Sequence, residues 1–344
     1  MHIEHIRHFL RRNGAKPCHE GRVLRAWTQG LALDSGPVAA ENYFPNALRA
    51  ALPLLDAELA ALLRIQSEHE GTDASSRLLL QLADGQTVES VLLPKDGLCV
   101  SSQVGCAVGC TFCMTGRGGL LRQLGSAEIV AQVVLARRRR KVAKVVFMGM
   151  GEPAHNMDAV LDAIELLGTE GGIGHKNLVF STVGDRRVFE RLPGARVKPA
   201  LALSLHTTRA ELRAQLLPKA QPIDPAELVE LGERYARATG YPIQYQWTLL
   251  AGINDGDDEL EGIVRLLQGK YAVMNFIPFN PVDGGAAGEA YCRPSLERCQ
   301  ALTLHLYRHG ILAKLRQSAG QEIAGACGQL RARHAATAAF AAPS

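Results

Sequence analysis

Three cysteines, Cys106, Cys110 and Cys113, lie within a run of eight residues. A loop with this spacing can present all three thiolates to a single inorganic centre. Thiolates are the ligands that hold iron–sulfur clusters, and three of them leave one iron of a four-iron cubane open. An open iron can bind a substrate as well as pass electrons. The spacing therefore predicts an iron–sulfur cluster with one open coordination position.

Two other interpretations use the same residues. Structural zinc prefers four ligands, usually in two separated pairs, and Cys99 could supply the fourth thiolate here. Free cysteines also pack as small hydrophobic residues that have no chemical role. The cysteine spacing alone leaves both alternatives open.

The composition is that of an ordinary globular protein. The chain has 344 residues, of which 47% are hydrophobic and 21% charged, enough to bury a sizeable core. No apolar stretch approaches the roughly 18 residues that span a membrane, and the charged N-terminus lacks a signal core. We therefore expect a cytoplasmic protein without membrane contact. In that compartment, eight cysteines indicate metal ligands or catalytic thiols rather than a disulfide framework.

Charge gives only weak information about partners, because the formal net charge is +4. A basic run at Arg137–Lys141 is more specific. Cations in such a run can neutralise nucleic-acid phosphates. They are equally favoured at the solvated end of a helix, where they complement the helix dipole. Both interpretations stay open for this run.

The hydrophobic pattern divides the chain into three kinds of segment. Residues 1 to about 70 are predicted to be helical, and strands at 78–82 and 88–93 flank Asp84-Gly85, a pair typical of a hairpin turn. Strands and helices then alternate, which predicts a parallel sheet. The expected strands are 98–103, 143–149, 177–182, 199–205, 243–250, 272–277 and 311–316. The expected helices are 126–141, 157–168, 185–191, 225–239, 257–268 and 295–309.

Unusual polar residues follow the carboxyl ends of several of these strands. They are found in segments 106–113, 149–153, 181–182, 204–206 and 280–281. Barrels and open α/β sheets build their sites at this edge. The pattern therefore predicts a single pocket with the three cysteines at its rim.

Individual residues in these segments have more than one possible role. Gly151 would let backbone approach a ligand and Glu152 could hold an amine, although the pair also suits a strand-to-helix turn before Pro153. Ser181, Ser204 and Asn280 could bond ribose hydroxyls or a carboxylate, or could be turn residues. His206 could be an acid, a base or a structural imidazole, and the sequence does not choose.

Two further thiols and one carboxylate stand near these segments. Cys327 lies among small residues at 325–329, which leave room for a substrate, and Cys99 precedes the three-cysteine run. The pattern alone favours a buried filler for Cys99 and an incidental tail residue for Cys327. Glu89 is expected to face solvent, because Val88, Val91 and Leu93 can supply the buried face of its strand.

Several long motifs together resemble the RlmN/Cfr family of radical S-adenosylmethionine RNA (adenine) methyltransferases, most closely its RlmN-type members. The matching segments are 14–27, 99–113, 149–153, 204–206, 277–281 and 320–330. The resemblance implies an α/β fold: an incomplete (β/α)6 radical-SAM barrel with an N-terminal helical accessory domain and a β-hairpin extension. The implied boundaries are 1–70 for the accessory domain, 71–97 for the hairpin extension, 98–320 for the core and 321–344 for the C-terminal segment.

The resemblance also implies cofactors and roles. Cys106, Cys110 and Cys113 would bind a [4Fe–4S] cluster whose open iron chelates S-adenosyl-L-methionine. Cys327 would accept a methyl group, and a 5′-deoxyadenosyl radical would activate that group for addition to adenine. Glu89 would remove the ring proton, and Cys99 would release the product by forming a transient disulfide with Cys327. The residues implied to line the S-adenosylmethionine site are Gly151, Glu152, Ser181, Ser204, Leu205, His206 and Asn280.

The implied substrate is an adenosine in 23S rRNA, with tRNA a further candidate, and the implied partner is a reducing electron-transfer protein. Carbon 2 is the expected position and carbon 8 the alternative. A noncatalytic zinc- and RNA-binding protein, or a radical enzyme acting on a small molecule, are the rival functions. One departure bears on the target: residues 185–189 replace a segment that commonly contains proline in the family.

Overall fold

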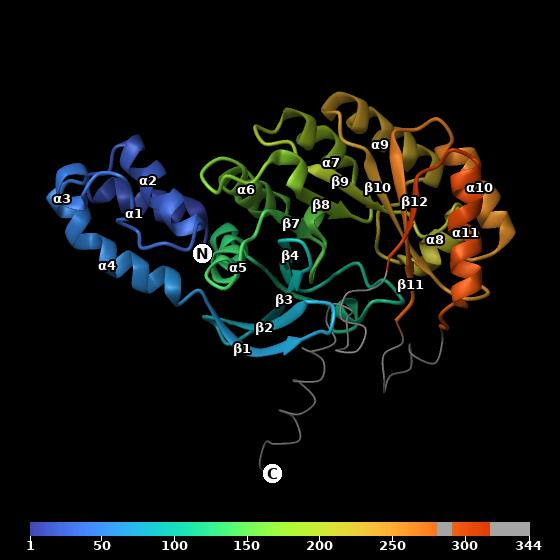
Figure 1. Ribbon diagram of the computed structural model, residues 1–344, viewed down its shortest axis with the longest axis horizontal. Coiled ribbons are helices and arrows are strands. Elements are labelled where there is room, and N and C mark those ends of the chain that lie inside the picture. Colours follow the sequence, from blue (N-terminus) through green and yellow to red (C-terminus); the bar gives the residue numbers. More distant parts are fainter. Residues whose placement is uncertain (281–290, 317–344) are drawn as a thin grey trace, which may run out of the picture.

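The computed structural model describes residues 1–280 and 291–316. Four helices form the N-terminal part and lie beside the rest of the chain (Figure 1). They are α1 (Ile3–Arg12), α2 (Pro17–Thr28), α3 (Ala40–Tyr43) and α4 (Asn46–Ala60). The Ile3 amide donates to Ser126 Oγ at 2.9 Å, which fixes the start of the chain to the first helix of the following part.

An antiparallel unit comes next. It consists of β1 (Leu63–Glu70), β2 (Ser76–Leu82) and β3 (Thr87–Leu93), which pair in that order. The predicted hairpin is therefore present, but the helical prediction for residues 63–70 is wrong. Pairing of β1 with β2, from Leu63 opposite Leu82 to Glu70 opposite Ser76, overrides the helical pattern of the local sequence.

Seven parallel strands continue the same ten-stranded sheet. They are β4 (Gly97–Cys99), β7 (Lys144–Phe147), β8 (Leu178–Thr182), β9 (Ala200–Ser204), β10 (Ile243–Leu249), β11 (Ala272–Pro278) and β12 (Ala313–Leu315). Strand β4 joins the two parts, because it pairs antiparallel with β3 and parallel with β7. The first expected strand, 98–103, ends earlier than predicted, at Cys99.

The expected helices connect these strands in the predicted order. They are α5 (Ser126–Arg137), α6 (Met157–Gly168), α7 (Arg186–Arg191), α9 (Pro225–Thr239), α10 (Asp257–Leu267) and α11 (Leu296–Arg308). A short pair, β5 (Gln103–Gly105) with β6 (Leu120–Gln123), and the helix α8 (Ala210–Leu216) were not predicted. The incomplete (β/α)6 barrel, the N-terminal helices and the antiparallel extension are confirmed.

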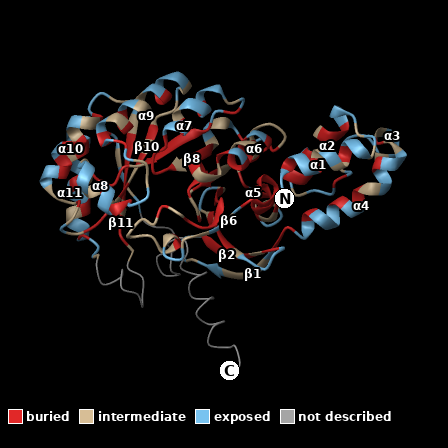
Figure 2. Cartoon of the chain, turned by 180° about the vertical axis from the view of Figure 1, so that it is seen from behind, coloured by how far each residue is buried: buried red, intermediate tan, exposed pale blue. Residues whose placement is uncertain are grey.

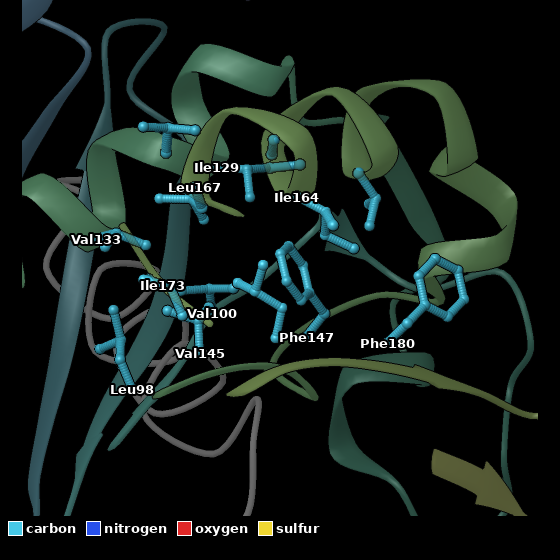
Figure 3. Close-up of a cluster of buried hydrophobic side chains, with 14 of the residues drawn as sticks. Leu98, Val100, Ile129, Val133, Val145, Phe147, Ile164, Leu167, Ile173 and Phe180 are labelled. Atoms are coloured by element: carbon cyan, nitrogen blue, oxygen red, sulfur yellow. The ribbon is translucent and has the colours of Figure 1, made fainter. Parts of the chain in front are cut away.

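The main core lies between the sheet and its outer helices. Figure 3 shows Leu98, Val145 and Phe147 on the strands facing Ile129 and Ile164 on α5 and α6. In Figure 2 the strands are buried, and the helices that cover them have exposed outer faces. This core uses one face of the parallel strands and leaves the other face to line the barrel interior. None of the helices in the described residues is long and apolar enough to cross a membrane.

Candidate active site

The three-cysteine loop follows β5 and is fixed at several points. The Cys106 amide donates to the Gly119 carbonyl at 3.0 Å, and the Thr111 amide donates to the Leu216 carbonyl at 3.0 Å. Gly105 has a φ of +83°, and a Cβ there would lie 2.0 Å from the Gly119 oxygen, so only glycine fits. The loop is thus held between β6 and the end of α8.

Cys106 and Cys110 share one apolar cluster. Cys106 is buried, Cys110 and Cys113 are half-buried, and Val108 and Leu217 belong to the same cluster as Cys106 and Cys110. Burial raises the pKa of Cys106 to about 12, and the neighbouring negative groups Glu152 and Cys113 add to the effect. Burial also raises the pKa of Cys110. Cys106 and Cys110 therefore stay protonated until a metal displaces their protons, as thiolate metal sites require.

The arrangement of these residues is compatible with a cluster. Among residues 1–280 and 291–316, no three side chains of the ligand types converge closely enough to hold one metal ion. Thiolates of a cubane bind three different irons, so they need not converge on one point. The loop brings the three thiols close enough for their charges to act on one another, as this arrangement needs.

Glu152 lies beside this loop, at the turn after β7. Its Oε1 accepts from the Ala154 amide at 3.0 Å and its Oε2 from the Val183 amide at 2.9 Å. Burial raises the pKa of Glu152 to about 7, against the opposing effect of these two amides. Both roles considered for the Gly151–Glu152 pair are therefore compatible with the structure: Glu152 caps the turn, and after a further bond to the Thr182 side chain its carboxylate still has a lone pair for a ligand.

The glycines around Glu152 allow close packing with the loop. Gly151 has a φ of +107°, and a Cβ there would lie 2.6 Å from Gln103 Cβ. The Gln103 side chain accepts from the Glu152 amide at 2.7 Å. Gln103 was not singled out in the sequence. It links the strand before the three-cysteine loop directly to the Glu152 turn.

The ends of the next strands lie at the same mouth of the barrel. Ser181 pairs with Ala202, and Ser204 pairs with Gln246, so the two serines stand near the ends of adjacent parallel strands. Leu205 follows and is buried. Asn280 is half-buried just beyond the end of β11. The expected grouping of strand ends at one edge is present.

His206 has a defined role in this arrangement. Its Nδ1 accepts from the Thr248 amide at 2.9 Å, so Nε2 carries the proton in the neutral ring. Burial, together with the nearby Arg213 cation, lowers the pKa of His206 to about 3. The backbone is left-handed, with φ +61°. Of the three roles considered, the structure favours a neutral, positioned imidazole that can donate from Nε2.

Cys99 ends β4 and lies inside the barrel. It packs with Val146, Val179 and Ala202 from the next three parallel strands. Cys99 is thus buried, as the buried-filler interpretation required. It lies, however, on the face of the sheet that lines the barrel. Cys327 lies outside the described residues.

Glu89 is buried, with an exposed side-chain fraction of 1%, and it forms an ion pair with Arg77 at 3.9 Å. The expectation that it faces solvent is wrong. Both faces of β3 are covered: Ser90 on the opposite face donates to Gln132 of α5 at 2.7 Å. Sequence alternation cannot show a strand that is buried on both sides.

The sequence also missed Arg213 on α8. This side chain is buried and its Nη2 donates to the Ser204 carbonyl at 3.2 Å and to the Val183 carbonyl. Its Nε has no hydrogen-bond partner within residues 1–280 and 291–316. Burial lowers the pKa of Arg213 to about 10. A lone arginine between Leu212 and Leu216 was the available signal, because a cation on an apolar face needs a buried partner.

The basic run at 137–141 is largely used within the chain. Arg137 donates to the Thr28 carbonyl at 2.8 Å, Arg139 pairs with Glu68, and Lys141 pairs with Asp96 at 3.2 Å. Arg140 donates to two carbonyls of the antiparallel unit. These contacts fasten α5 to neighbouring segments and favour neither of the two roles considered for the run.

Comparison with known proteins agrees with this geometry. The radical SAM superfamily matches residues 100–267. The chain is 72% identical to a probable RNA methyltransferase of Aromatoleum aromaticum, over 100% of this chain and 96% of that protein. It is 68% identical to another of Pseudomonas aeruginosa, over 93% and 92% of the two chains.

A solved structure of a radical SAM methyltransferase also matches this chain. The crystal structure of a radical SAM methyltransferase from Sphaerobacter thermophilus superposes with a TM-score of 0.80 at 33% identity, covering 96% of this chain and 97% of that one. The fold and site thus define a radical SAM protein. The chain belongs to the radical SAM superfamily and, within it, to the family of these methyltransferases.

Proposed function

We propose that this protein is a radical SAM methyltransferase that methylates carbon 2 of an adenosine in 23S rRNA, with tRNA as a further substrate. One observation supports it above all. The three-cysteine loop, the Glu152 turn and the ends of β8 and β9 surround one barrel mouth, and Cys99 stands inside the same barrel. The names of the relatives support RNA as the substrate class, and the resemblance to RlmN-type proteins supports carbon 2 as the methylated position.

The cofactor roles follow from the residues at this mouth. Cys106, Cys110 and Cys113 hold a [4Fe–4S] cluster, which supplies the electron that cleaves S-adenosylmethionine. Glu152 accepts from the amino group of the methionine moiety. The remaining lining residues of the S-adenosylmethionine site are Gly151, Ser181, Ser204, Leu205, His206 and Asn280. His206 donates from Nε2 and keeps this role over a wide pH range, because its ring stays neutral.

The transfer to RNA uses the thiols. Cys327 carries the methyl group until its carbon is joined to the adenine. Cys99 then attacks the Cys327 sulfur, which breaks the bond between that sulfur and the transferred carbon, releases the product and leaves a disulfide that cellular thiols reduce. Glu89 takes the ring proton of the adenine. A target base has to leave its stack to reach the barrel interior, so an unpaired or bulged adenosine is the expected site. An electron-transfer protein reduces the cluster.

RNA from a deletion strain tests the substrate. Mass spectrometry that separates 2-methyladenosine from 8-methyladenosine should show loss of the 2-methyl isomer from 23S rRNA. Loss of the 8-methyl isomer instead would show that carbon 8 is methylated. Unchanged RNA would refute the proposal that 23S rRNA is the substrate.

Purified protein tests the chemistry. Anaerobically reconstituted enzyme with a strong reductant should contain iron and sulfide and release 5′-deoxyadenosine. Stoichiometric zinc without sulfide would favour a noncatalytic zinc- and RNA-binding protein. The Cys327→Ala variant should methylate no RNA. Full turnover of this variant on a small molecule would favour the other rival function.

A further inference from the structure

A cavity opens at the end of the barrel opposite the three cysteines, where the parallel strands begin. It has a volume of about 620 Å³. Its wall includes the first residue of β7, Lys144, and the first residue of β9, Ala200. It also includes Val273 near the start of β11. We call this cavity the amino-end pocket. It is separate from the mouth that holds the three cysteines, since the parallel strands run from one to the other.

Four cations line the amino-end pocket: Lys144, Lys176, Lys314 and Arg316. No carboxylate from the described residues lines it, and none of the four cations forms an ion pair within residues 1–280 and 291–316. Burial lowers the pKa of Lys144, and the nearby positive charges of Arg316 and Lys314 lower it further. Uncompensated like charges destabilise a fold, so this grouping calls for an anion.

Acidic groups near the pocket are already engaged elsewhere. Glu230 pairs with Lys270 at 2.5 Å, and Glu233 pairs with Arg237 at 2.6 Å. These carboxylates therefore do not neutralise the pocket cations.

A hydrogen bond to a buried side chain holds one of the cations, Arg316, in position. The Arg316 Nε donates to Asn275 Oδ1 at 2.8 Å, and Asn275 is fully buried. This bond leaves the two terminal nitrogens of the guanidinium group without a described partner. A guanidinium group oriented in this way matches two phosphate oxygens. Lys176 and Lys314 are exposed at the rim and add mobile point charges.

Two tyrosines stand among the cations. Tyr241 is half-buried in the wall, and Tyr271 at the rim is 40% exposed, with Arg237 5.6 Å from its ring centre. Cations that follow a phosphate backbone, interleaved with aromatic rings on which bases stack, are typical of surfaces that bind unpaired nucleic acid. A site for free phosphate would need only the cations, so the tyrosines favour a nucleic acid over free phosphate.

The chain's own C-terminal segment is a poor occupant by charge. Residues 317–344 contain one glutamate and two arginines, so they do not complement four cations. Charge complementarity favours the substrate of the proposed function, because an RNA long enough to be folded extends well beyond the base in the active site.

We propose that the amino-end pocket is a second RNA-binding site, which holds the phosphate backbone of an unpaired segment of the substrate away from the modified adenosine. This proposal rests on the proposed function. The pocket would add affinity and select substrates by shape, while the chemistry stays at the opposite mouth.

The test compares RNA binding by the reconstituted full-length protein and the double variant Lys176→Ala/Lys314→Ala. Both lysines are exposed and lie outside the proposed catalytic machinery. Affinity for a 23S rRNA transcript should fall roughly tenfold at low salt. The slope of log affinity against log salt should become shallower by about two, since each lysine–phosphate contact contributes about one. The control Arg265→Ala/Arg308→Ala removes two exposed cations from α10 and α11 and should leave the slope unchanged.

Tyr271 gives an independent check. Tyr271→Ala should weaken binding, whereas Tyr271→Phe, which keeps the ring, should not. An unchanged salt slope in the lysine variant, or equal losses in it and in the arginine control, would overturn the proposal.

Turnover separates this proposal from the proposed function. The lysine variant should release 5′-deoxyadenosine as the wild type does without RNA, and should methylate saturating RNA at the wild-type rate with a raised KM. If the wild type methylates RNA but the variant keeps its KM, only the second site is wrong. If the wild type methylates no RNA, the proposed function itself fails.

Discussion

Arg77 and Glu89 form a salt bridge across adjacent antiparallel strands, with 1% of each side chain exposed. Arg77 pairs in register with Val91, two residues after Glu89, so the two charged groups are diagonal neighbours on one face of the sheet. This face continues toward Cys99, which pairs with Val91 on the next strand. The sequence-based expectation for Glu89 failed here because it considered one strand alone.

Removing the carboxylate should destabilise the fold. Glu89→Gln removes the negative charge that pairs with the buried Arg77 cation, and breaking a buried pair in this way costs about 3–5 kcal/mol. Urea denaturation should show this loss, and Glu89→Gln/Arg77→Met should recover much of it. The exposed Glu70→Gln change is the control, with an expected effect below about 0.5 kcal/mol. A loss for Glu89→Gln no larger than the control's would show that the pair contributes nothing.

Glu152 should make the stability of the metal-free protein fall as pH rises. Its pKa is about 7 in the folded protein against an ordinary value of 4.5. Between these values the folded state holds a proton that the unfolded state has lost, so the free energy of unfolding decreases with pH. The decrease between pH 5 and pH 8 should be roughly 2–3 kcal/mol larger in the wild type than in Glu152→Gln.

Denaturation curves across this pH range measure the difference. The exposed Glu190→Gln variant should keep the wild-type dependence. Parallel curves for wild type and Glu152→Gln would mean that Glu152 is already ionised at pH 5.

The alternation of strands and helices could be read from the sequence because each parallel strand is an apolar run and each helix has one apolar face. The prediction for 225–239 matches α9 at both ends, where Asp224 caps the start and Gly240 adopts a left-handed conformation at the end. These boundary signals are local, so the sequence carries them.

Features that depend on distant partners could not be read in this way. Strand β1 exists because β2 pairs with it, and Glu89 is buried because other elements cover both faces of β3. Arg213 reaches carbonyls at the ends of two strands that are remote in sequence from each other. Spacing singled out the three cysteines, and position after a strand or the family resemblance singled out the other site candidates. The residues that support them appear only once the chain is folded.

His206 should stay neutral at every pH at which the protein is folded. Its pKa is lowered to about 3, so nitrogen NMR should show an Nε2-protonated ring that does not titrate between pH 5 and pH 8. His206→Asn should be tolerated better than His206→Ala, because Asn keeps an acceptor for the Thr248 amide and tolerates the left-handed backbone. Losing the acceptor should cost about 1–3 kcal/mol. Titration near pH 6.5 would contradict the prediction.

Arg213 should raise the reduction potential of the proposed cluster. The residue lies on α8, whose Leu216 carbonyl holds the three-cysteine loop, and its positive charge acts on Cys110. Reduction adds a negative charge, which a nearby buried cation favours. Arg213→Met should therefore lower the midpoint potential by on the order of 60 mV, a tenfold change in the one-electron equilibrium.

Potentiometry followed by electron paramagnetic resonance measures this shift in reconstituted protein. Arg213→Lys keeps the charge but loses the planar group that bonds the Val183 and Ser204 carbonyls. It should therefore destabilise the fold while leaving the potential close to that of the wild type. Equal potentials in Arg213→Met and the wild type would show that this cation acts only on the fold. A shift of the same size in both variants would trace the effect to the carbonyl contacts rather than to the charge.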